Sequence, residues 1–415
     1  MAITQSLDHQ AAPSRAAWRM WVPCLGMALC TWLSFVDRQV LGSLTPTILK
    51  ETGMSAKDFA DVNGYFFLAY TLANPVWGSI LDSIGLRAGM LMAVGLWTAA
   101  SMSHAGMSTI LGFSMARGLL GFGEGATFPG GMRTAVESLP ADRRGRAIAL
   151  SFSGGTLGGV AAPLIVVPIA LHYGWRAAFI FTGGLGLLWL VIWSIIARPP
   201  FLVLGAPKAK KLAWPNPLER RFWALVSSYA LPAIAPGPIL AVIPLYLSAA
   251  TAVGGLGVTQ AGLGHILWAP PLAWGLGYFF WGWAADKYAH DNRRPIGMFL
   301  LLTVFSLAFG FTTKTSSVAL AMLIISWAAF VGGGFQMVAL KVGAYTYPRE
   351  QAALMSGIAS GSWALVNYVL LKFLGPLFNQ HRYTEAFWLI TALPAIGIAI
   401  WLVLSSNQEA TPTRA

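Results

Sequence analysis

The stretch WGSILD, at residues 77–82, ends one apolar run of the sequence, and WGWAAD, at residues 281–286, ends another run 204 residues later with the same Gly-to-Asp spacing. A proline followed closely by arginine also recurs, at residues 140–144 and again at residues 348–349. One such match has little meaning, but two in corresponding loops indicate an internal repeat. We therefore expect two halves that are related by pseudo-symmetry.

The composition excludes a water-soluble protein. The chain has 415 residues, of which 56% are hydrophobic and only 10% are charged, and its mean hydropathy is +0.63. Soluble domains carry about 25% charged residues, so most of these side chains must face something other than water. The apolar runs are continuous over about 20 residues, as in membrane-spanning helices, whereas barrel strands would alternate over about 10. The predicted fold class is an all-α polytopic membrane protein.

Apolar runs separated by short polar loops predict twelve transmembrane helices in two pseudo-symmetric six-helix bundles. The predicted helices span residues 20–45, 62–81, 88–104, 110–136, 147–171, 177–197, 222–247, 262–285, 295–313, 318–342, 352–378 and 385–405. The longest polar interval separates the sixth helix from the seventh. The predicted organisation is an N-terminal bundle at residues 1–197, a cytoplasmic linker at residues 198–221 and a C-terminal bundle at residues 222–415.

The basic residues indicate how the chain is oriented in the membrane. Of the 27 lysines and arginines, 17 lie in loops on the side of the linker, and 5 lie in loops on the other side: Lys50, Lys57, Arg176, Lys314 and Arg382. By the positive-inside rule, both termini are expected in the cytoplasm. The net charge of +12 is spread over separate loops, so we expect no nucleic-acid partner.

Four ionisable residues lie deep inside predicted helices, where each costs at least about 2.5–3.5 kcal/mol on insertion scales: Asp37, Arg38, Arg117 and Glu124. Arg117 and Glu124 are two helical turns apart, so both can face a central cavity. Asp37 and Arg38 are adjacent, so their side chains diverge by about 100° and each needs another partner. The expected partners are Arg117 for Asp37 and a bound anion for Arg38.

Residues 78–87, GSILDSIGLR, resemble the G-x-x-x-D-x-x-G-x-R loop signature of the major facilitator superfamily. Other motifs resemble its anion:cation symporter branch: Asp37-Arg38, Arg117 with Glu124, the run at residues 123–130, and Gly174-Trp175-Arg176 with Phe179. That branch includes bacterial hexuronate and aldonate transporters and animal vesicular glutamate and sialic acid carriers. The resemblance implies a monomeric secondary transporter of the cell inner membrane that carries a small organic anion with protons. It also implies that Asp37 and Glu124 are proton sites and that Arg38 binds substrate.

The four buried charges suggest how transport would work. A guanidinium offers two parallel donors to a carboxylate, so Arg38 is the candidate anchor for the anion. Asp37 and Glu124, with Arg117 beside them, would change protonation as the cavity opens to one side or the other. Proton binding would then favour anion binding. In the alternative interpretation, Asp37 and Arg117 form a structural ion pair.

Four more polar residues are candidates for substrate binding: Tyr70, Asn74, Ser360 and Asn367. Tyr70 and Asn74 are four positions apart on one face of the second helix, and Ser360 and Asn367 lie in the eleventh. Packing or a hydrogen bond between helices is the competing explanation for each. Lys372 is expected to snorkel to the surface, and the alternative is a second positive charge for a dicarboxylate.

The repeated loops carry the candidate gating residues. Asp82 lies near Arg87, and Asp286 lies near Arg293, so salt bridges between the halves on the cytoplasmic side are expected to form in one state and break in the other. The role of Lys341 stays open. The seventh helix is a further candidate gate, because four prolines prevent a regular helix there: Pro232, Pro236, Pro238 and Pro244.

Two positions depart from the sugar-acid members of the branch. Phe35 stands where tyrosine is common, and the fifth helix has Ser153, Gly154 and Gly155 where a glutamine commonly faces sugar hydroxyls. An unpaired buried hydroxyl costs about 1–3 kcal/mol. The expected substrate is an organic anion, such as a sugar acid (hexuronate or aldonate) or another carboxylate, and these changes favour a less hydroxylated or partly aromatic acid.

Competing functions make different demands on the sequence. Efflux or facilitated transport of aromatic or amphipathic carboxylates or drug-like compounds would not need Arg38. A membrane-embedded enzyme would need a nucleophile with its base or a metal site, but the six histidines are scattered without ligand spacing. We therefore expect no catalytic residue, metal or cofactor. The lone buried carboxylates favour protons over sodium as the coupling ion.

Overall fold

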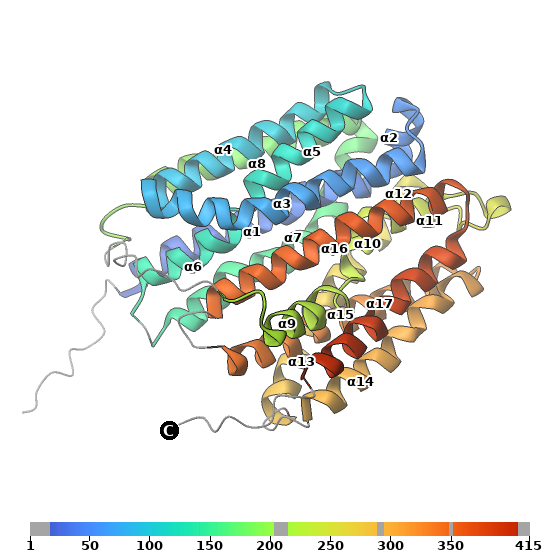
Figure 1. Ribbon diagram of the computed structural model, residues 1–415. Coiled ribbons are helices and arrows are strands. Elements are labelled where there is room, and N and C mark those ends of the chain that lie inside the picture. The colour runs from blue at the N-terminus through green and yellow to red at the C-terminus, as the bar shows by residue number, and fades with distance from the viewer. Residues whose placement is uncertain (1–16, 141, 203–214, 289–293, 348–351, 406–415) are drawn as a thin grey trace, which may run out of the picture.

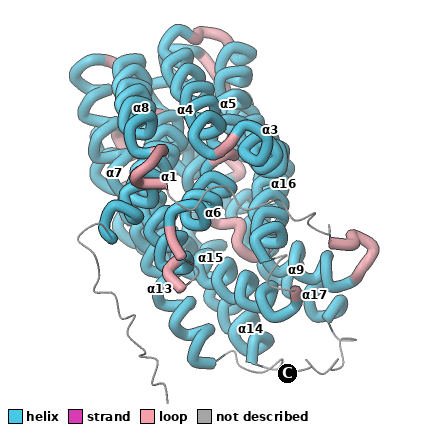
Figure 2. The backbone as a smooth tube through the Cα atoms, turned by 90° about the vertical axis from the view of Figure 1, so that its left-hand side faces the viewer, coloured by secondary structure: helices cyan, strands magenta, loops and turns pink. Residues whose placement is uncertain are grey.

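The computed structural model describes residues 17–140, 142–202, 215–288, 294–347 and 352–405, and this part of the chain consists of helices and short loops without a strand (Figure 1, Figure 2). The first half contains α1 (Val22–Ser43), α2 (Thr45–Thr52), α3 (Ala56–Ile84), α4 (Leu86–Ser103), α5 (Ile110–Glu124), α6 (Thr127–Ser138), α7 (Arg144–Tyr173) and α8 (Trp175–Ile196). The second half contains α9 (Arg220–Ala230), α10 (Pro236–Ala241), α11 (Ile243–Ser248), α12 (Gln260–Ile266), α13 (Ala269–Tyr288), α14 (Arg294–Ser306), α15 (Val318–Thr346), α16 (Ala352–Asn379) and α17 (Tyr383–Ser405). Short 3-10 helices lie at Ala17–Trp21, His104–Gly106, Thr251–Val253 and Leu307–Lys314.

Each predicted transmembrane helix corresponds to one of these helices or to consecutive ones. Seven segments are long and apolar enough to cross a membrane: Trp18–Ser43, Arg144–Tyr173, Trp175–Ile196, Pro295–Lys314, Val318–Thr346, Leu354–Asn379 and Tyr383–Ser405. The helices α3 and α4 are continuous but less apolar. The remaining three predicted helices are interrupted, because 110–136 is α5 and α6, 222–247 is α9 to α11, and 262–285 is α12 and α13. Residues 203–214 of the predicted linker lie outside the described residues.

The interruptions have local causes. Pro129 lies in the first turn of α6 and has no N–H to donate to the preceding turn. Gly125, between α5 and α6, approaches α3 so closely that an added Cβ would lie 2.3 Å from the Cβ of Ala73. The predicted helix over 110–136 is therefore divided into α5 and α6. The prediction that the proline-rich seventh helix is irregular is confirmed by its division into α9, α10 and α11.

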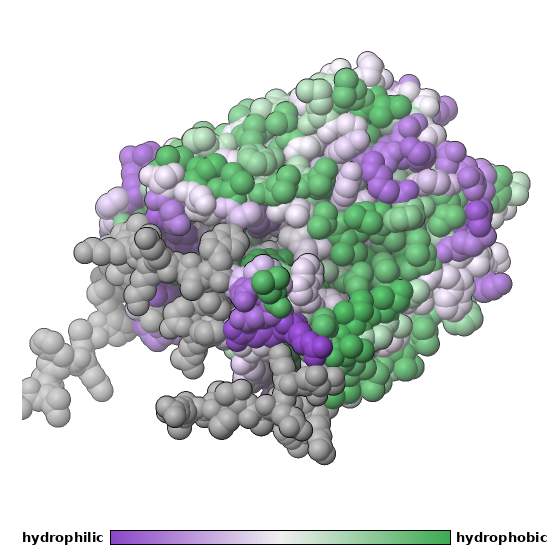
Figure 3. Space-filling model, viewed as in Figure 1, coloured by the Kyte–Doolittle hydropathy of each residue, from purple (hydrophilic) through white to green (hydrophobic). Residues whose placement is uncertain are grey.

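Helices that are distant in sequence lie side by side along the molecule (Figure 1). In the first half α1 packs along α7 and α3 along α5, and in the second half α13 packs along α15. Between the halves, α3 packs along α16, and α7 contacts α12 and α13. Large apolar side chains point outward, and Leu111, Phe279 and Val403 are 70%, 78% and 70% exposed. Figure 3 shows this apolar surface over α16 and α17, with hydrophilic residues towards the helix ends, as a bilayer requires.

The two halves are held together more closely at one end. We call the end with the start of α7 and the end of α8 the linker face, and the end with α2 and α12 the opposite face (Figure 1). At the opposite face Gln260 donates to the carbonyl oxygen of Ser43 at 2.6 Å and accepts from Thr47 at 2.9 Å. Nearer the linker face, a Cβ added at Gly78 of α3 or Gly357 of α16 would meet no atom within 4 Å. The helices that join the halves are thus less tightly packed there.

Candidate substrate site

A buried ion pair joins α1 to α5 inside the first half. The Nε and Nη2 atoms of Arg38 both donate to Oε2 of Glu124, at 3.1 and 2.8 Å, and the hydroxyl of Ser34 donates to the same oxygen at 2.9 Å. Arg38 is 9% exposed and Glu124 is fully buried. Within the described part of the chain, Oε1 of Glu124 has no hydrogen-bond partner. The carboxylate therefore holds the guanidinium through one oxygen only.

Aromatic rings surround the Arg38 guanidinium. Its Cζ atom lies 4.8, 4.9 and 5.1 Å from the ring centroids of Phe35, Phe66 and Tyr70. Distances below about 6 Å to a ring face are favourable for a cation. These rings lie on α1 and α3, so the charged end of Arg38 is stabilised by an acid from α5 and by aromatic groups from two other directions.

Arg117 of α5 reaches across to α1 and α3. Its Nη2 atom donates to Oδ1 of Asn63 at 2.7 Å and to the backbone oxygen of Arg38 at 3.1 Å. Its Nε and Nη1 atoms are buried and have no hydrogen-bond partner among the described residues. Arg117 therefore positions the backbone at Arg38, which its sequence position alone did not reveal.

Asp37 turns away from Arg117. Its Oδ1 accepts a hydrogen bond from Ser101 of α4 at 2.8 Å, and the Ser101 hydroxyl lies 3.3 Å from that of Thr182 on α8. Oδ2 of Asp37 is buried without a partner among the described residues. The expected Asp37–Arg117 pair is thus replaced by Asp37–Ser101, and the partner of Arg38 in this structure is Glu124.

The divergence of Asp37 and Arg38 explains why Asp37 pairs with Ser101 and why Arg38 pairs with Glu124. Adjacent side chains on a helix point about 100° apart, so Asp37 faces α4 while Arg38 faces α5. Sequence analysis missed Asn63 and Ser34 as partners. Spacing was the available signal, because Asn63 lies two turns before Tyr70 on α3 and Ser34 lies one turn before Arg38 on α1.

The other predicted binding residues divide into two groups. Tyr70 contacts Arg38 and stacks on Phe66 at 5.9 Å. Asn74 donates to the backbone oxygen of Tyr70 at 3.1 Å, and Asn367 donates to that of Trp363 at 2.9 Å. The Oδ1 atoms of both asparagines are buried without a partner among the described residues. Ser360 is half-buried on α16. The structure therefore brings Tyr70 to Arg38 but gives Asn74 and Asn367 bonds within their own helices.

The repeated aspartates each pair with a base of their own half. Asp82 accepts from Arg133 at 2.8 Å, and Asp286 accepts from Lys341 at 2.7 Å. Among the described residues, both of these pairs lie within one half, and Lys341 is the partner of Asp286 in this state.

Arg87, the predicted neighbour of Asp82, does not pair with it among the described residues. Arg87 donates to the backbone oxygen of Ser194 at 3.1 Å. Gly85 lies between Asp82 and Arg87 and has a φ of 85°, so the chain turns there and carries Arg87 onto α4 and away from the aspartate. Arg293, the predicted neighbour of Asp286, lies outside the described residues.

Lys372 forms an ion pair that crosses between the halves. Its Nζ atom lies 2.7 Å from Asp61 of α3 and 4.9 and 5.4 Å from the ring centroids of Tyr65 and Tyr368. Lys372 was expected to snorkel to the surface; its side chain is 36% exposed, and its ammonium group pairs with Asp61 there. Asp61 also accepts from Lys57 of its own helix at 2.8 Å, so the same carboxylate carries one bond within α3 and one bond to α16.

Replacing Lys372 with methionine is expected to loosen the opposite face. The change removes an ion pair and two cation–π contacts, together about 1.4 kcal/mol at a partly exposed site, which corresponds to about a tenfold change in an opening equilibrium. A cysteine placed at Ala60, which packs on Gly375 of α16, should react about tenfold faster with an impermeant thiol reagent. Lys57→Met is the matched control and should leave the rate unchanged. Equal rates in the two variants would contradict this reading.

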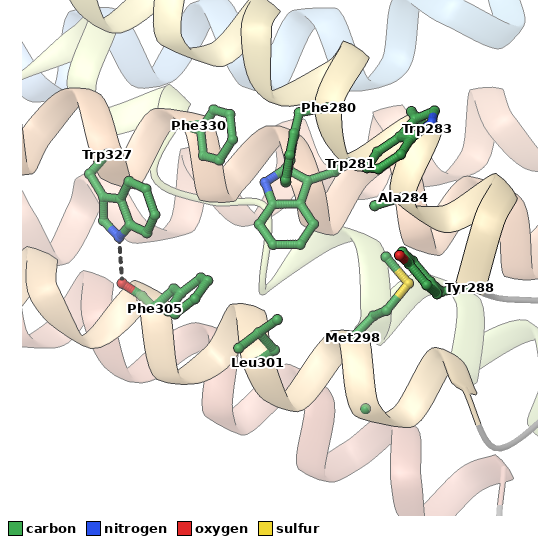
Figure 4. A pocket seen from close by; sticks show the side chains of 11 residues that line it. Phe280, Trp281, Trp283, Ala284, Tyr288, Met298, Leu301, Phe305, Trp327 and Phe330 are labelled. Atoms are coloured by element: carbon green, nitrogen blue, oxygen red, sulfur yellow. Dashed lines mark hydrogen bonds between the residues drawn. The ribbon is translucent and has the colours of Figure 1, made fainter.

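A wide cavity lies elsewhere, between α13, α14 and α15 (Figure 4). It has a volume of about 860 Å³, and none of its eleven lining residues is charged. Phe280, Trp283 and Tyr288 at its border are 48%, 55% and 49% exposed, so it opens on the outer surface of the molecule. It offers an anion no counter-charge, and we therefore place the candidate site at Arg38. No metal-binding group of three or more histidine, cysteine or acidic residues occurs in the described part of the chain.

Comparison with known proteins agrees with this architecture. Residues 27–269 match the family model described as Major Facilitator Superfamily. The hexuronate transporter of Escherichia coli (strain K12) is 23% identical over 416 residues, which cover 93% of this chain and 94% of that protein. The D-galactonate transporter of Escherichia coli O6:H1 is 23% identical over 97% of this chain and 98% of its own length. The galacturonate transporter of Dickeya chrysanthemi is 27% identical over 61% of this chain and 77% of its own.

Solved structures show the same fold. A bacterial homolog of the human lysosomal transporter Spinster, in an inward-facing and unoccupied conformation, matches with a TM-score of 0.77 and 17% sequence identity over 94% of this chain and 97% of that one.

Proposed function

Because this chain belongs to the Major Facilitator Superfamily, we propose that it is a proton-coupled symporter that takes up an organic anion across the cell inner membrane by alternating access. The observation that supports this most is the one-oxygen contact between Glu124 and Arg38. A substrate carboxylate would use the same Nε and Nη2 donors, so Glu124 and the anion compete for Arg38.

That competition provides the coupling. When Glu124 takes up a proton, it loses the charge that holds Arg38, and the guanidinium is free to bind a carboxylate through two parallel bonds. Proton and anion therefore bind together and leave together. Asp37, whose Oδ2 has no partner among the described residues, is the second proposed proton site. Arg117 supports both by holding the α1 backbone at Arg38.

The proposed substrate is a small carboxylate. The names of the hexuronate, D-galactonate and galacturonate transporters make sugar acids the first class to test. Tyr70 is proposed to contact the bound acid because its ring lies against Arg38. Asn74, Ser360 and Asn367 are proposed to line the path of the anion.

The orientation follows from the distribution of basic loops. With the linker face in the cytoplasm, both termini are cytoplasmic, and the contacts between the halves at Gln260 close the opposite face. We assign the structure to an inward-facing state of a monomer, in which the bundles 1–197 and 222–415 rock against each other. The side chains of Asp82 and Asp286 are 69% and 81% exposed, so they are available to the other half when the linker face closes. Arg87 and Arg293 are their proposed partners in that state.

Purified protein in proteoliposomes tests the function. With an inward proton gradient, labelled glucuronate, galactonate or benzoate should accumulate against its own gradient, and a protonophore should abolish this. Accumulation driven instead by a sodium gradient would remove the proton-coupling assignment. Transport of neutral compounds with equal efficiency, unaffected by loss of Arg38, would support the alternative of facilitated or efflux transport of amphipathic compounds.

A further inference from the structure

The walls around Arg38 are aromatic where a polyhydroxylated substrate would need hydrogen-bonding groups. Phe35, Phe66 and Tyr70 lie within 5.1 Å of its Cζ atom. Phe35 is only half-buried, so part of its ring is accessible to a bound molecule. A carboxylate that reaches Arg38 therefore meets ring surfaces beside its binding atoms.

Glycine residues of α7 make room for the Phe35 ring. A Cβ added at Gly155 would lie 2.9 Å from a Phe35 ring carbon, and one added at Gly158 would lie 2.3 Å from the backbone oxygen of Trp32. A longer side chain, such as a glutamine, does not fit at Gly155 while Phe35 keeps its place, or at Gly158 while the Trp32 backbone keeps its place. Gly155 and Gly158 of α7 thus place no polar side chain against Phe35.

The second half contributes aromatic surface as well. The Trp274 ring lies 5.9 Å from that of Phe35 and 5.3 Å from that of Tyr278. The polar atoms of both residues are already used, because the Trp274 indole N–H donates to Oε1 of Gln336 at 3.0 Å and the Tyr278 hydroxyl donates to the same oxygen. These two side chains therefore offer no free hydrogen-bond donor beside Phe35.

We propose that the anion carried by this protein is an aromatic carboxylate, in which a planar ring sits close to the acid group. The inference rests on the proposed function and specifies its substrate. A ring gains offset or edge contacts from Phe35 and Trp274 while its carboxylate binds Arg38. A sugar acid of similar size leaves hydroxyls unpaired against these rings, which lowers its affinity.

Binding to purified wild-type protein tests the proposal with benzoate, phenylacetate, cyclohexanecarboxylate, glucuronate and galactonate. The best aromatic acid should bind at least tenfold more tightly than cyclohexanecarboxylate, which has a similar shape without a π-system, and than either sugar acid. Phe35→Leu should weaken the aromatic acid about five- to tenfold and change cyclohexanecarboxylate by less than twofold. Phe311→Leu, at an exposed ring outside the site, is the matched control and should change neither.

Phe35→Tyr keeps the ring and provides a second variant if Phe35→Leu does not fold. It should leave the affinity for the aromatic acid within twofold and strengthen glucuronate binding. If a sugar acid binds most tightly to the wild type and loses its affinity in Arg38→Lys, the aromatic proposal is overturned while the proposed function stands. If no carboxylate of any class binds, the proposed function itself fails.

Discussion

Glu124→Gln should abolish uphill transport while leaving exchange intact. In wild-type proteoliposomes an inward proton gradient should concentrate the anion, and in the variant the ratio of inside to outside anion should fall to about one, because the amide cannot release a proton and the two bindings are no longer linked. Counterflow of labelled against unlabelled anion should persist, since Arg38 remains. In the wild type, the affinity for the anion should rise at acidic pH, and in the variant this rise should be absent. Proteoliposome uptake with and without the gradient, counterflow, and anion binding at two pH values measure these three effects.

The matched control for this variant is Glu51→Gln. Glu51 forms an ion pair with Arg176 at 2.9 Å, but this pair is half-exposed and lies at the opposite face. Neutralising it removes an acid of the same type without touching the site, so uphill accumulation should survive. Proton-driven accumulation that persists in Glu124→Gln would sink the assignment of Glu124 as the coupling acid.

Arg38→Lys should weaken anion binding about 10- to 100-fold. Lysine keeps the positive charge but loses the planar fork, and one charge-assisted hydrogen bond is worth about 1.5–3 kcal/mol, which is about one to two factors of ten in affinity. The cation–π contacts with Phe35, Phe66 and Tyr70 weaken as well. Calorimetric titration of the best-binding carboxylate measures the change, and Arg176→Lys should leave it unaltered.

Folding must be separated from binding in this test. Arg38→Ala leaves the Glu124 carboxylate buried and unpaired, which costs about 3–5 kcal/mol of stability. The double variant Arg38→Ala with Glu124→Gln removes both charges and should recover a thermal transition near that of the wild type, while anion binding stays lost. A double variant that folds and still binds the anion with wild-type affinity would exclude Arg38 as the anchor.

The sequence predicted the fold because the apolar residues of each membrane helix are consecutive in the chain. A run of about 20 apolar residues has few structures open to it in a bilayer, so each predicted helix has a counterpart. Interruptions were harder to predict. The break after Glu124 depends on Gly125 meeting Ala73 of another helix, and no pattern within α5 contains that contact.

The sequence predicted which residues form the candidate site, but it did not predict which of them pair with each other. Depth in the membrane identified Asp37, Arg38, Arg117 and Glu124, because burial of charge is a property of each residue. Partners depend on which neighbouring helix each face meets. The Lys372–Asp61 pair requires α3 beside α16, and the two residues are 311 positions apart, so nothing local in the sequence connects them.

The site is unequally shared between the repeated halves. Among the described residues, the charged groups at the site all come from α1 and α5, while α13 and α15 supply rings and one amide that is already engaged by Trp274 and Tyr278. Under the proposed function, substitutions in α13 and α15 would change which acid is accepted and would leave Asp37 and Glu124, the proposed proton sites, unaltered.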